Sequence, residues 1–164
     1  EFHLVQTDPN FANYRYAPDS GKLILLDFGA TRAYAPATAA AYRDLLTSSV
    51  AGDRPRLGKA AETIGYFQAD IREHHRNAVL DIFELACEPL RHRGPYDFGH
   101  SDLAARIRDA GLVLGMDRDF WHTPPADALF LHRKLGGLYL LAATLRARVD
   151  VAGLFQSAPD TAPA

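Results

Sequence analysis

The stretch that decides the fold is Lys22-Leu23-Ile24-Leu25-Leu26-Asp27-Phe28-Gly29. It begins as an apolar run of strand length, and the turn residues Pro18-Asp19-Ser20-Gly21 come directly before it. A second extended run, residues 14–16, lies on the other side of this turn, so the two runs predict a β-hairpin. Residues 2–5 form a further short extended run. The first 30 residues are therefore expected to be strand-like.

Helical periodicity replaces this pattern from Pro36 onward. Apolar residues recur three and four positions apart, and glycine, proline or serine stands where each helix should end or begin. The fifth helix is apolar on nearly every side, so we expect it to be the buried central helix. The sequence predicts a mainly α fold, in which a short N-terminal β-hairpin precedes five or six helices and a flexible tail. The predicted helices span 36–51, 54–65, 68–90, 101–114, 125–148 and 150–157, and the tail is 158–164.

Length and composition limit what this chain can be. Its 164 residues suffice for one domain, and 48% hydrophobic with 23% charged residues is typical of a globular protein. The net charge of -2 offers no general attraction to nucleic acid, so no nucleic-acid partner is expected. Cys87 has no second cysteine to pair with and is expected to be a small core residue. The most apolar stretch, 135–145, is shorter than the roughly 20 residues of a spanning helix, so no transmembrane segment is predicted.

Three polar residues near the start of the chain form a candidate site: Asp8, Asn13 and Asp27. If the hairpin turn centres near Asp19 and Ser20, Asn13 faces Asp27 across the hairpin, with Cβ atoms roughly 5 Å apart. An amide oxygen and a carboxylate suit Mg²⁺, which prefers oxygen ligands together with substrate phosphates. Asp8, on the incoming loop, would accept or orient the proton of an attacking hydroxyl or water. The set predicts phosphoryl transfer, with Asp8 catalytic and Asn13 and Asp27 as metal ligands.

Other interpretations of these motifs compete with a catalytic one. Asp8 could cap a turn, and Asp27 could cap the start of a helix. A second Asp-Phe-Gly triplet, at 97–99, follows Gly94-Pro95-Tyr96 without an apolar strand to hold it. We interpret that copy as a loop decoy, because the triplet alone has little specificity.

The histidines and one aromatic pair receive structural interpretations. The seven histidines show no metal-ligand spacing, and the adjacent His74 and His75 cannot share one helix face. Residues 132–134, His-Arg-Lys, interrupt the fifth helix and are left out of the catalytic set. Phe120 and Trp121 form either a hydrophobic plug, the favoured interpretation, or an exposed patch for contact with a membrane or a quinone precursor.

Three stretches of this sequence resemble the ABC1/UbiB atypical kinase family: 6–13 (Gln-Thr-Asp-Pro-Asn-Phe-Ala-Asn), 25–32 (Leu-Leu-Asp-Phe-Gly-Ala-Thr-Arg) and 131–137 (Leu-His-Arg-Lys-Leu-Gly-Gly). The resemblance runs over nearly the whole chain, and the branch it resembles supports ubiquinone (coenzyme Q) biosynthesis. It implies a protein-kinase-like fold in which residues 1–157 are the C-terminal lobe, with ATP or ADP and Mg²⁺ as ligands.

The same resemblance assigns the site residues and the partners. Asp8 would be the catalytic-loop aspartate, and Asn13 and Asp27 would hold the metal and, with it, the nucleotide cofactor. Contacts with a lipid, a quinone precursor or a biosynthetic complex stay open as further partners. The implied location is the cytoplasm in a bacterium, with membrane association left open, or the mitochondrion in a eukaryote.

The sequence departs from ordinary protein kinases in ways that bear on function. Asn10 stands where kinases usually carry a phosphate-contacting lysine, and Thr7 precedes Asp8 where regulated kinases carry an arginine. Few residues separate Gly29 from the helix that begins near Pro36, which leaves no long activation segment to hold a peptide. We therefore expect ATP hydrolysis, or transfer to a small-molecule or lipid-linked acceptor.

Elements of a complete nucleotide cleft are missing from these residues. The 164 residues contain no glycine-rich loop, no preceding strand lysine and no Lys-x-Gly-Gln motif, and the chain begins at Glu1 without methionine. We expect a piece of a longer protein that is inactive alone. Two other functions stay open: a small-molecule phosphotransferase of the aminoglycoside or choline kinase type, and a non-catalytic helical binding module that keeps a relic motif.

Overall fold

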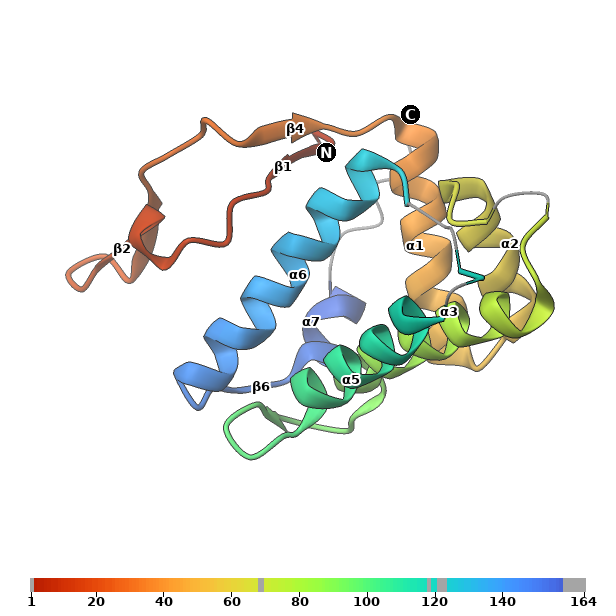
Figure 1. Ribbon diagram of the computed structural model, residues 1–164. Coiled ribbons are helices and arrows are strands. Elements are labelled where there is room, and N and C mark those ends of the chain that lie inside the picture. The colour runs from red at the N-terminus through yellow and green to blue at the C-terminus, as the bar shows by residue number, and fades with distance from the viewer. Residues whose placement is uncertain (1, 68–69, 118, 121–123, 158–164) are drawn as a thin grey trace.

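A computed structural model describes residues 2–67, 70–117, 119–120 and 124–157. Short strands at the N-terminus lie across one side of a body made of helices (Figure 1). This is the mainly α, kinase-like arrangement predicted from the sequence. The strands are β1 (Leu4–Gln6), β2 (Tyr14–Ala17), β3 (Lys22–Leu25), β4 (Thr31–Ala33), β5 (Tyr96–Asp97) and β6 (Arg148–Val149). The helices are η1 (Phe11–Asn13), α1 (Pro36–Ala51), α2 (Arg54–Ile64), α3 (Glu73–Ala86), α4 (Glu88–Arg91), α5 (Leu103–Met116), α6 (Ala126–Thr144) and α7 (Val151–Ser157).

The predicted hairpin is present as the antiparallel pair β2–β3. Its last pair joins Ala17 to Lys22, and the four turn residues between them end at Gly21, whose φ of 64° glycine adopts without strain. The early extended run also forms a strand, β1, which pairs antiparallel with β4. The sequence did not predict β4, β5 or β6, because strands of two or three residues are too short to show a periodicity.

Helix ends agree with the local stop and start signals. Helix α1 ends at Ala51, and Gly52, whose φ of 70° is left-handed, follows it. Asp53 then caps α2 by accepting a hydrogen bond from the Arg56 backbone N–H at 3.1 Å. The helix predicted over 68–90 is shorter and interrupted: α3 ends at Ala86, and α4 follows separately. Pro89 explains the break, because proline has no N–H to continue the hydrogen-bond ladder of α3. Residues 68–69 lie outside the described residues.

Two apolar clusters hold the helices together. The larger one joins α1, α2 and α3 through buried side chains such as Leu45, Leu57 and Leu80, with Phe120 packed against it. The smaller one surrounds Tyr96, Phe98 and Leu103 near the β5–β6 pair. Cys87 is buried, as predicted, and burial raises the pKa of its thiol.

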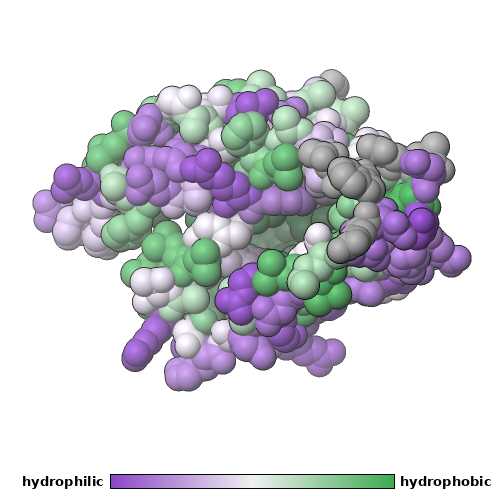
Figure 2. All heavy atoms as spheres, in the orientation of Figure 1, coloured by the Kyte–Doolittle hydropathy of each residue, from purple (hydrophilic) through white to green (hydrophobic). Residues whose placement is uncertain are grey.

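The prediction that the fifth helix is buried is wrong. Helix α6 does lie centrally, between the N-terminal strands and the other helices (Figure 1), but Ala128 is its one buried residue among those described. Ala128 packs in the larger cluster, and Tyr139 and Ala142 pack against the smaller one, but many of the other apolar side chains of α6 face outward. On the face drawn in Figure 2, hydrophobic groups lie among hydrophilic ones at the molecular surface. Four leucines of α6 are 39% to 61% exposed: Leu129, Leu135, Leu138 and Leu140.

None of the described helices has the length and apolar character needed to cross a membrane. Phe120 packs against the larger cluster, as the plug interpretation requires, whereas Trp121 lies outside the described residues. The predicted flexible tail, 158–164, also lies outside them.

Candidate active site

Two chain segments, residues 7–13 and 26–30, run side by side and carry the predicted site; together they are called the loop pair. At one end, Thr7 donates two hydrogen bonds to the Ala30 carbonyl, from its backbone N–H at 3.0 Å and from its hydroxyl at 2.7 Å. At the other end, the Leu26 N–H donates to the Asn13 carbonyl at 2.9 Å. Asp8 lies on one segment and Asp27 on the other, between these two ties. The β1–β4 and β2–β3 pairs thus fix two sequence-distant aspartates in one loop pair.

Asp8 and Asn13 are in direct contact. The Asn13 side-chain amide donates a hydrogen bond to Asp8 Oδ2 at 2.8 Å. Asn13 is buried at the end of η1, a turn that Asn10 caps by accepting a bond from the Ala12 N–H at 3.1 Å. Because the amide nitrogen serves Asp8, the amide oxygen is the Asn13 atom that can serve a cation. The spacing of Asp8 and Asn13 therefore has a structural basis.

The predicted register of the hairpin is wrong by one residue. Tyr14 pairs with Leu25, so the residue opposite Asn13 is Leu26 and not Asp27. The turn itself is centred between Asp19 and Ser20, as predicted, and Ala17 and Lys22 close it; continuing this register along the hairpin brings Leu26 opposite Asn13. Asp27 follows directly after this pair, where the chain leaves the hairpin. The three predicted residues belong to one loop pair, although the direct pairing of Asn13 with Asp27 does not occur.

The two Asp-Phe-Gly copies share a local turn but differ in surroundings. Asp27 Oδ1 accepts a hydrogen bond from the Gly29 N–H at 2.7 Å, and Asp97 Oδ1 accepts one from the Gly99 N–H at 3.0 Å. Asp97 also contacts His100, which holds the pKa of the Asp97 carboxyl below its usual range. Phe98 is buried in the smaller cluster, whereas Phe28 is 64% exposed. The second copy is a structural turn, while the first places an exposed aspartate in the loop pair that also carries Asp8 and Asn13.

Helix α6 contacts the Asp8 loop through residues that were not predicted to belong to the site. Arg133 lies 3.5 Å from Asp8 Oδ1, and Lys134 donates to Gln6 Oε1 at 2.9 Å and to the Tyr14 hydroxyl. Gly137 lies against Pro9, so closely that no side chain fits between them. The sequence signal for these residues was the polar interruption of an otherwise apolar helix at 132–134.

His132 points the opposite way, into the helical body. Its Nε2 hydrogen bonds with the Tyr66 hydroxyl, which in turn contacts the Tyr42 hydroxyl at 3.0 Å. The His132 and Tyr66 rings stack with centroids 5.3 Å apart. Burial lowers the pKa of His132 and raises that of Tyr66, so both groups are held neutral. Consecutive residues of α6 therefore link the larger cluster to the candidate site.

The start of α6 is tied to β4 by a second set of contacts. Arg32 donates to Asp127 Oδ1 from two nitrogens, at 3.1 and 2.8 Å, and its guanidinium lies 4.4 Å from the centre of the Phe130 ring. The Tyr34 hydroxyl donates to the Asp127 carbonyl at 2.9 Å. Because β4 follows the Asp27 turn directly, these contacts fix one side of the site to the helical body.

The donor set suits a hard cation beside a proton acceptor. Carboxylate and amide oxygens of Asp27 and Asn13 are the ligand types that Mg²⁺ prefers. Asp8 offers a carboxylate oxygen for a hydroxyl or water proton. A separate cavity of about 820 Å³ lies behind β1, against α1 and Leu131, and none of these three residues lines it. The predicted site residues therefore lie in the loop pair and not in that cavity.

The N-terminal strands and their connecting segments carry Asp8, Asn13 and Asp27 and are followed by a body of helices. The protein is therefore of the mainly helical, kinase-like class. Comparison with known proteins agrees. The ABC1 atypical kinase-like domain matches residues 1–61. The chain is 35% identical to the rat protein named atypical kinase COQ8B, mitochondrial, and the alignment covers 95% of the chain and 29% of the rat protein.

Two further relatives are similar over the same region. The Caenorhabditis elegans atypical kinase coq-8, mitochondrial, is 34% identical over 94% of the chain and 21% of its own length. The Saccharomyces cerevisiae atypical kinase COQ8, mitochondrial, is 35% identical over 94% of the chain and 31% of its own length. Residues 1–61 match the ABC1 atypical kinase-like domain, and the chain is similar to these kinases over nearly its whole length while it spans less than a third of theirs.

Proposed function

We propose that this chain is the C-terminal lobe of an ATP- and Mg²⁺-dependent atypical kinase or ATPase. The observation that carries the proposal is the bond from Asn13 to Asp8 inside the loop pair that also holds Asp27. Catalysis of phosphoryl transfer is mostly positioning and charge neutralisation, so a catalytic carboxylate beside a cation site is its central requirement. The match of residues 1–61 to the ABC1 atypical kinase-like domain supports the same reaction class.

Each residue has a separate part in this proposal. Mg²⁺, when bound, would neutralise charge on the nucleotide phosphates, and Asn13 and Asp27 are the residues that would hold it. Asp8 would accept or orient the proton of the attacking hydroxyl or water. Asn13 donates to Asp8 Oδ2 and so keeps this carboxylate oriented, while the Gly29 N–H fixes one oxygen of Asp27.

The acceptor is proposed to be water, a small molecule or a lipid-linked group, and not a peptide. The short segment after Gly29 is already used as β4, which pairs with β1 and is held by Asp127. It therefore offers no long surface on which a peptide could lie. The names of the relatives, and the family resemblance to proteins of ubiquinone biosynthesis, favour a part in that pathway and, in a eukaryote, a mitochondrial location.

Apolar side chains around Asp27 support the proposal that this lobe forms one half of a nucleotide cleft. Ile24, Leu26 and Phe28 are 48%, 53% and 64% exposed, on the hairpin and the turn that carry Asp27. We propose that the other half of the cleft covers them, and that these 164 residues alone do not turn over ATP. Apolar area of this kind is expected to be buried in the active protein.

The test compares the two Asp-Phe-Gly copies in the gene product that contains this chain. Asp27→Asn is expected to abolish both ATP turnover and the thermal shift produced by Mg²⁺ with ADP. Asp8→Asn is expected to lower turnover by on the order of 10²- to 10⁴-fold while the thermal shift remains. Asp97→Asn is the matched control, since it alters the same triplet in a turn that holds no site residue, and it is expected to change neither.

The alternatives give different outcomes. A binding module with a relic motif would show no Mg²⁺-dependent shift with ADP, and Asp27→Asn would leave it unchanged. A phosphotransferase of the aminoglycoside or choline kinase type would keep the Asp27 dependence, but turnover would rise sharply with one such acceptor. Equal effects of Asp27→Asn and Asp97→Asn would contradict the proposed site.

A further inference from the structure

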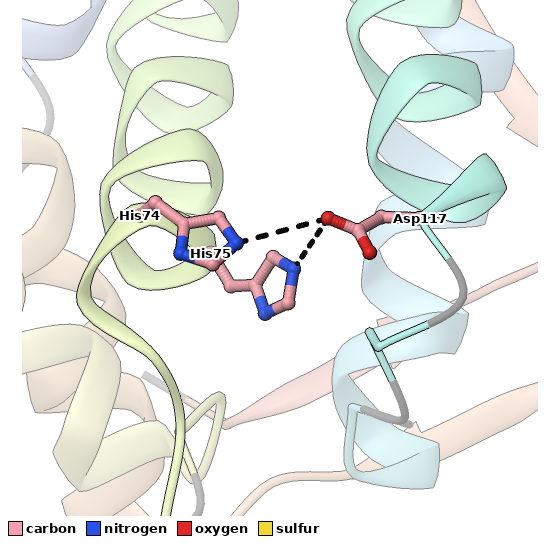
Figure 3. A group of neighbouring side chains, drawn as sticks. All are labelled: His74, His75 and Asp117. Carbon is pink, nitrogen blue, oxygen red and sulfur yellow. Dashed lines mark hydrogen bonds and ion pairs between the residues drawn. The ribbon is translucent and has the colours of Figure 1, made fainter.

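Three side chains meet at the junction of α3 and α5, well separated in sequence from the candidate active site. His74 and His75 lie in the first turn of α3, and Asp117 follows the last residue of α5 (Figure 3). Asp117 Oδ2 lies 2.8 Å from His75 Nε2 and 3.7 Å from His74 Nε2. One ligand atom from each residue lies within 4.8 Å of the others, and no other such group of three occurs among the residues described.

His74 and His75 were expected not to share one helix face, yet their rings approach the same carboxylate. Adjacent residues on a helix point about 100° apart, so they cannot both lie on one line along its surface. Their rings nevertheless tilt together, with centroids 4.0 Å apart, and both reach the same carboxylate. The third member lies 42 residues beyond His75, so no local spacing could show it.

Two imidazoles and one carboxylate form a donor set for a transition metal. Zinc binds histidine nitrogen and carboxylate oxygen at 2.0–2.2 Å, so tetrahedral ligand atoms stand about 3.3 Å apart. The separations from Asp117 Oδ2 to the two histidine nitrogens, 2.8 and 3.7 Å, lie on either side of that value. The nitrogen ligands disfavour Mg²⁺ and Ca²⁺, which prefer oxygen alone. The group thus differs in chemistry from Asn13 and Asp27.

The surroundings hold these ligands in place. The Asp119 N–H donates to Asp117 Oδ1 at 3.0 Å, which leaves Oδ2 directed at the histidines. The His75 side chain is 3% exposed and lies edge-on to the Phe120 ring, with centroids 5.1 Å apart. The His74 side chain is 61% exposed, so an ion can reach the group from solvent. The nearby cation Arg72 is paired with Asp119 at 2.6 Å.

We propose that His74, His75 and Asp117 form a site for a divalent transition metal ion, with Zn²⁺ as the best match. Three protein ligands leave a fourth position for water or another small ligand. Because the ligands come from the start of α3 and the end of α5, a bound ion would cross-link the two helices. This inference is independent of the proposed kinase function, since it uses none of the residues of the candidate active site.

The test measures metal binding by the chain without an affinity tag, using Zn²⁺ and Co²⁺ alone. We expect one Zn²⁺ per chain by calorimetry, a rise in melting temperature because the ion binds the folded state, and visible absorption bands of four-coordinate Co²⁺. Both His74→Gln, which changes an exposed side chain, and Asp117→Asn are expected to weaken binding by on the order of tenfold to a hundredfold.

The matched control is His100→Gln. His100 is also exposed and contacts a carboxylate, Asp97, at 3.2 Å, but it belongs to no group of three ligands in the described chain. It should leave the affinity and the Co²⁺ spectrum unchanged. The proposal is overturned if the chain binds no Zn²⁺ at micromolar concentration, or if His74→Gln binds as tightly as His100→Gln. Circular dichroism of each variant identifies any loss of affinity that comes from unfolding.

Discussion

Gly137 lies so close to Pro9 that a Cβ atom added to the glycine would stand 2.1 Å from the proline Cβ. Pro9 is the residue after Asp8, and its ring cannot move without moving the loop. Helix α6 therefore sets the position of Asp8 by direct contact. The neighbouring Gly136 has no atom within 4 Å of an added Cβ, so the two adjacent glycines differ completely in the space around them.

This contact predicts opposite results for two alanine variants. Gly137→Ala must push the Asp8 loop away from α6, and we expect it to cost about 1–3 kcal/mol of unfolding free energy. Gly136→Ala fills open space in a helix interior and is expected to stabilise by roughly 0.5–1 kcal/mol. Urea denaturation of the chain measures both values. Equal effects of the two substitutions would show that the Pro9 contact does not position the loop.

Lys134 predicts a stability loss in the strand frame. Its ammonium donates to Gln6 Oε1 and to the Tyr14 hydroxyl, and Gln6 Nε2 is buried with no hydrogen-bond partner among the described residues. Lys134→Met keeps the length of the side chain but leaves the amide oxygen of Gln6 unpaired, at a cost of roughly 1–3 kcal/mol. Lys59→Met, on the exposed face of α2, should stay within about 0.5 kcal/mol. Chemical denaturation gives the unfolding free energies of the two variants, provided that their m-values are equal. Equal losses of stability in Lys134→Met and Lys59→Met would contradict the role given to Lys134.

Local signals in the sequence predicted the elements whose ends are decided locally. Pro18 to Gly21 predicted the β2–β3 turn, and Gly52 with Asp53 predicted the break between α1 and α2, because backbone conformation and capping depend on those residues alone. The hydrogen bond from Asn13 to Asp8 also closes a turn of only a few residues, but the sequence did not predict it, since Asn13 was expected to face Asp27.

Contacts between distant elements could not be predicted in this way. The apolar pattern of α6 predicted burial, but which side of a helix is covered depends on its neighbours, and here polar residues such as Asp127 and Lys134 make contacts while several leucines stay exposed. The hairpin register was wrong by one residue because it depends on which pair closes the turn. Asp117 joins His74 and His75 through the packing of α3 on α5, a relation with no signature in the sequence.

His132 predicts a pH dependence of stability. Burial lowers its pKa in the folded state, whereas the unfolded chain has the ordinary value of about 6.5. The unfolded state therefore binds more protons below that pH, so this contribution to stability is complete above about pH 6.5 and is lost as the pH falls through the lowered pKa. Protonation also makes both ring nitrogens donors, so the charged His132 could bond to the Tyr66 hydroxyl only as a donor.

The corresponding variant is His132→Gln, which cannot titrate in this range. We expect the slope of unfolding free energy against pH to flatten below pH 6.5, as measured by urea denaturation at a series of pH values. His92→Gln removes an exposed imidazole and serves as the control for the other histidines. A slope that persists in His132→Gln and disappears in His92→Gln would assign the titration elsewhere.

Thr7 predicts a separation between stability and nucleotide binding. Its buried hydroxyl donates to the Ala30 carbonyl at 2.7 Å, and the same carbonyl still accepts from the Thr7 N–H when the hydroxyl is removed. Thr7→Val should therefore cost only about 1 kcal/mol. The lost hydrogen bond is one of those that hold the Asp8 segment against the Asp27 turn. In the gene product that contains this chain, we therefore expect a larger loss of free energy for binding of Mg²⁺ with ADP than for unfolding.

Thr63→Val provides the comparison, because the Thr63 hydroxyl makes an exposed bond within α2, to the Lys59 carbonyl at 3.0 Å. Denaturation and calorimetric titration of Mg²⁺ with ADP are measured on both variants. Weakened binding in Thr7→Val at a stability close to that of Thr63→Val would show that the tie serves the site. If both variants bind alike, the relative placement of Asp8 and Asp27 is maintained by the β1–β4 pair and α6 without Thr7.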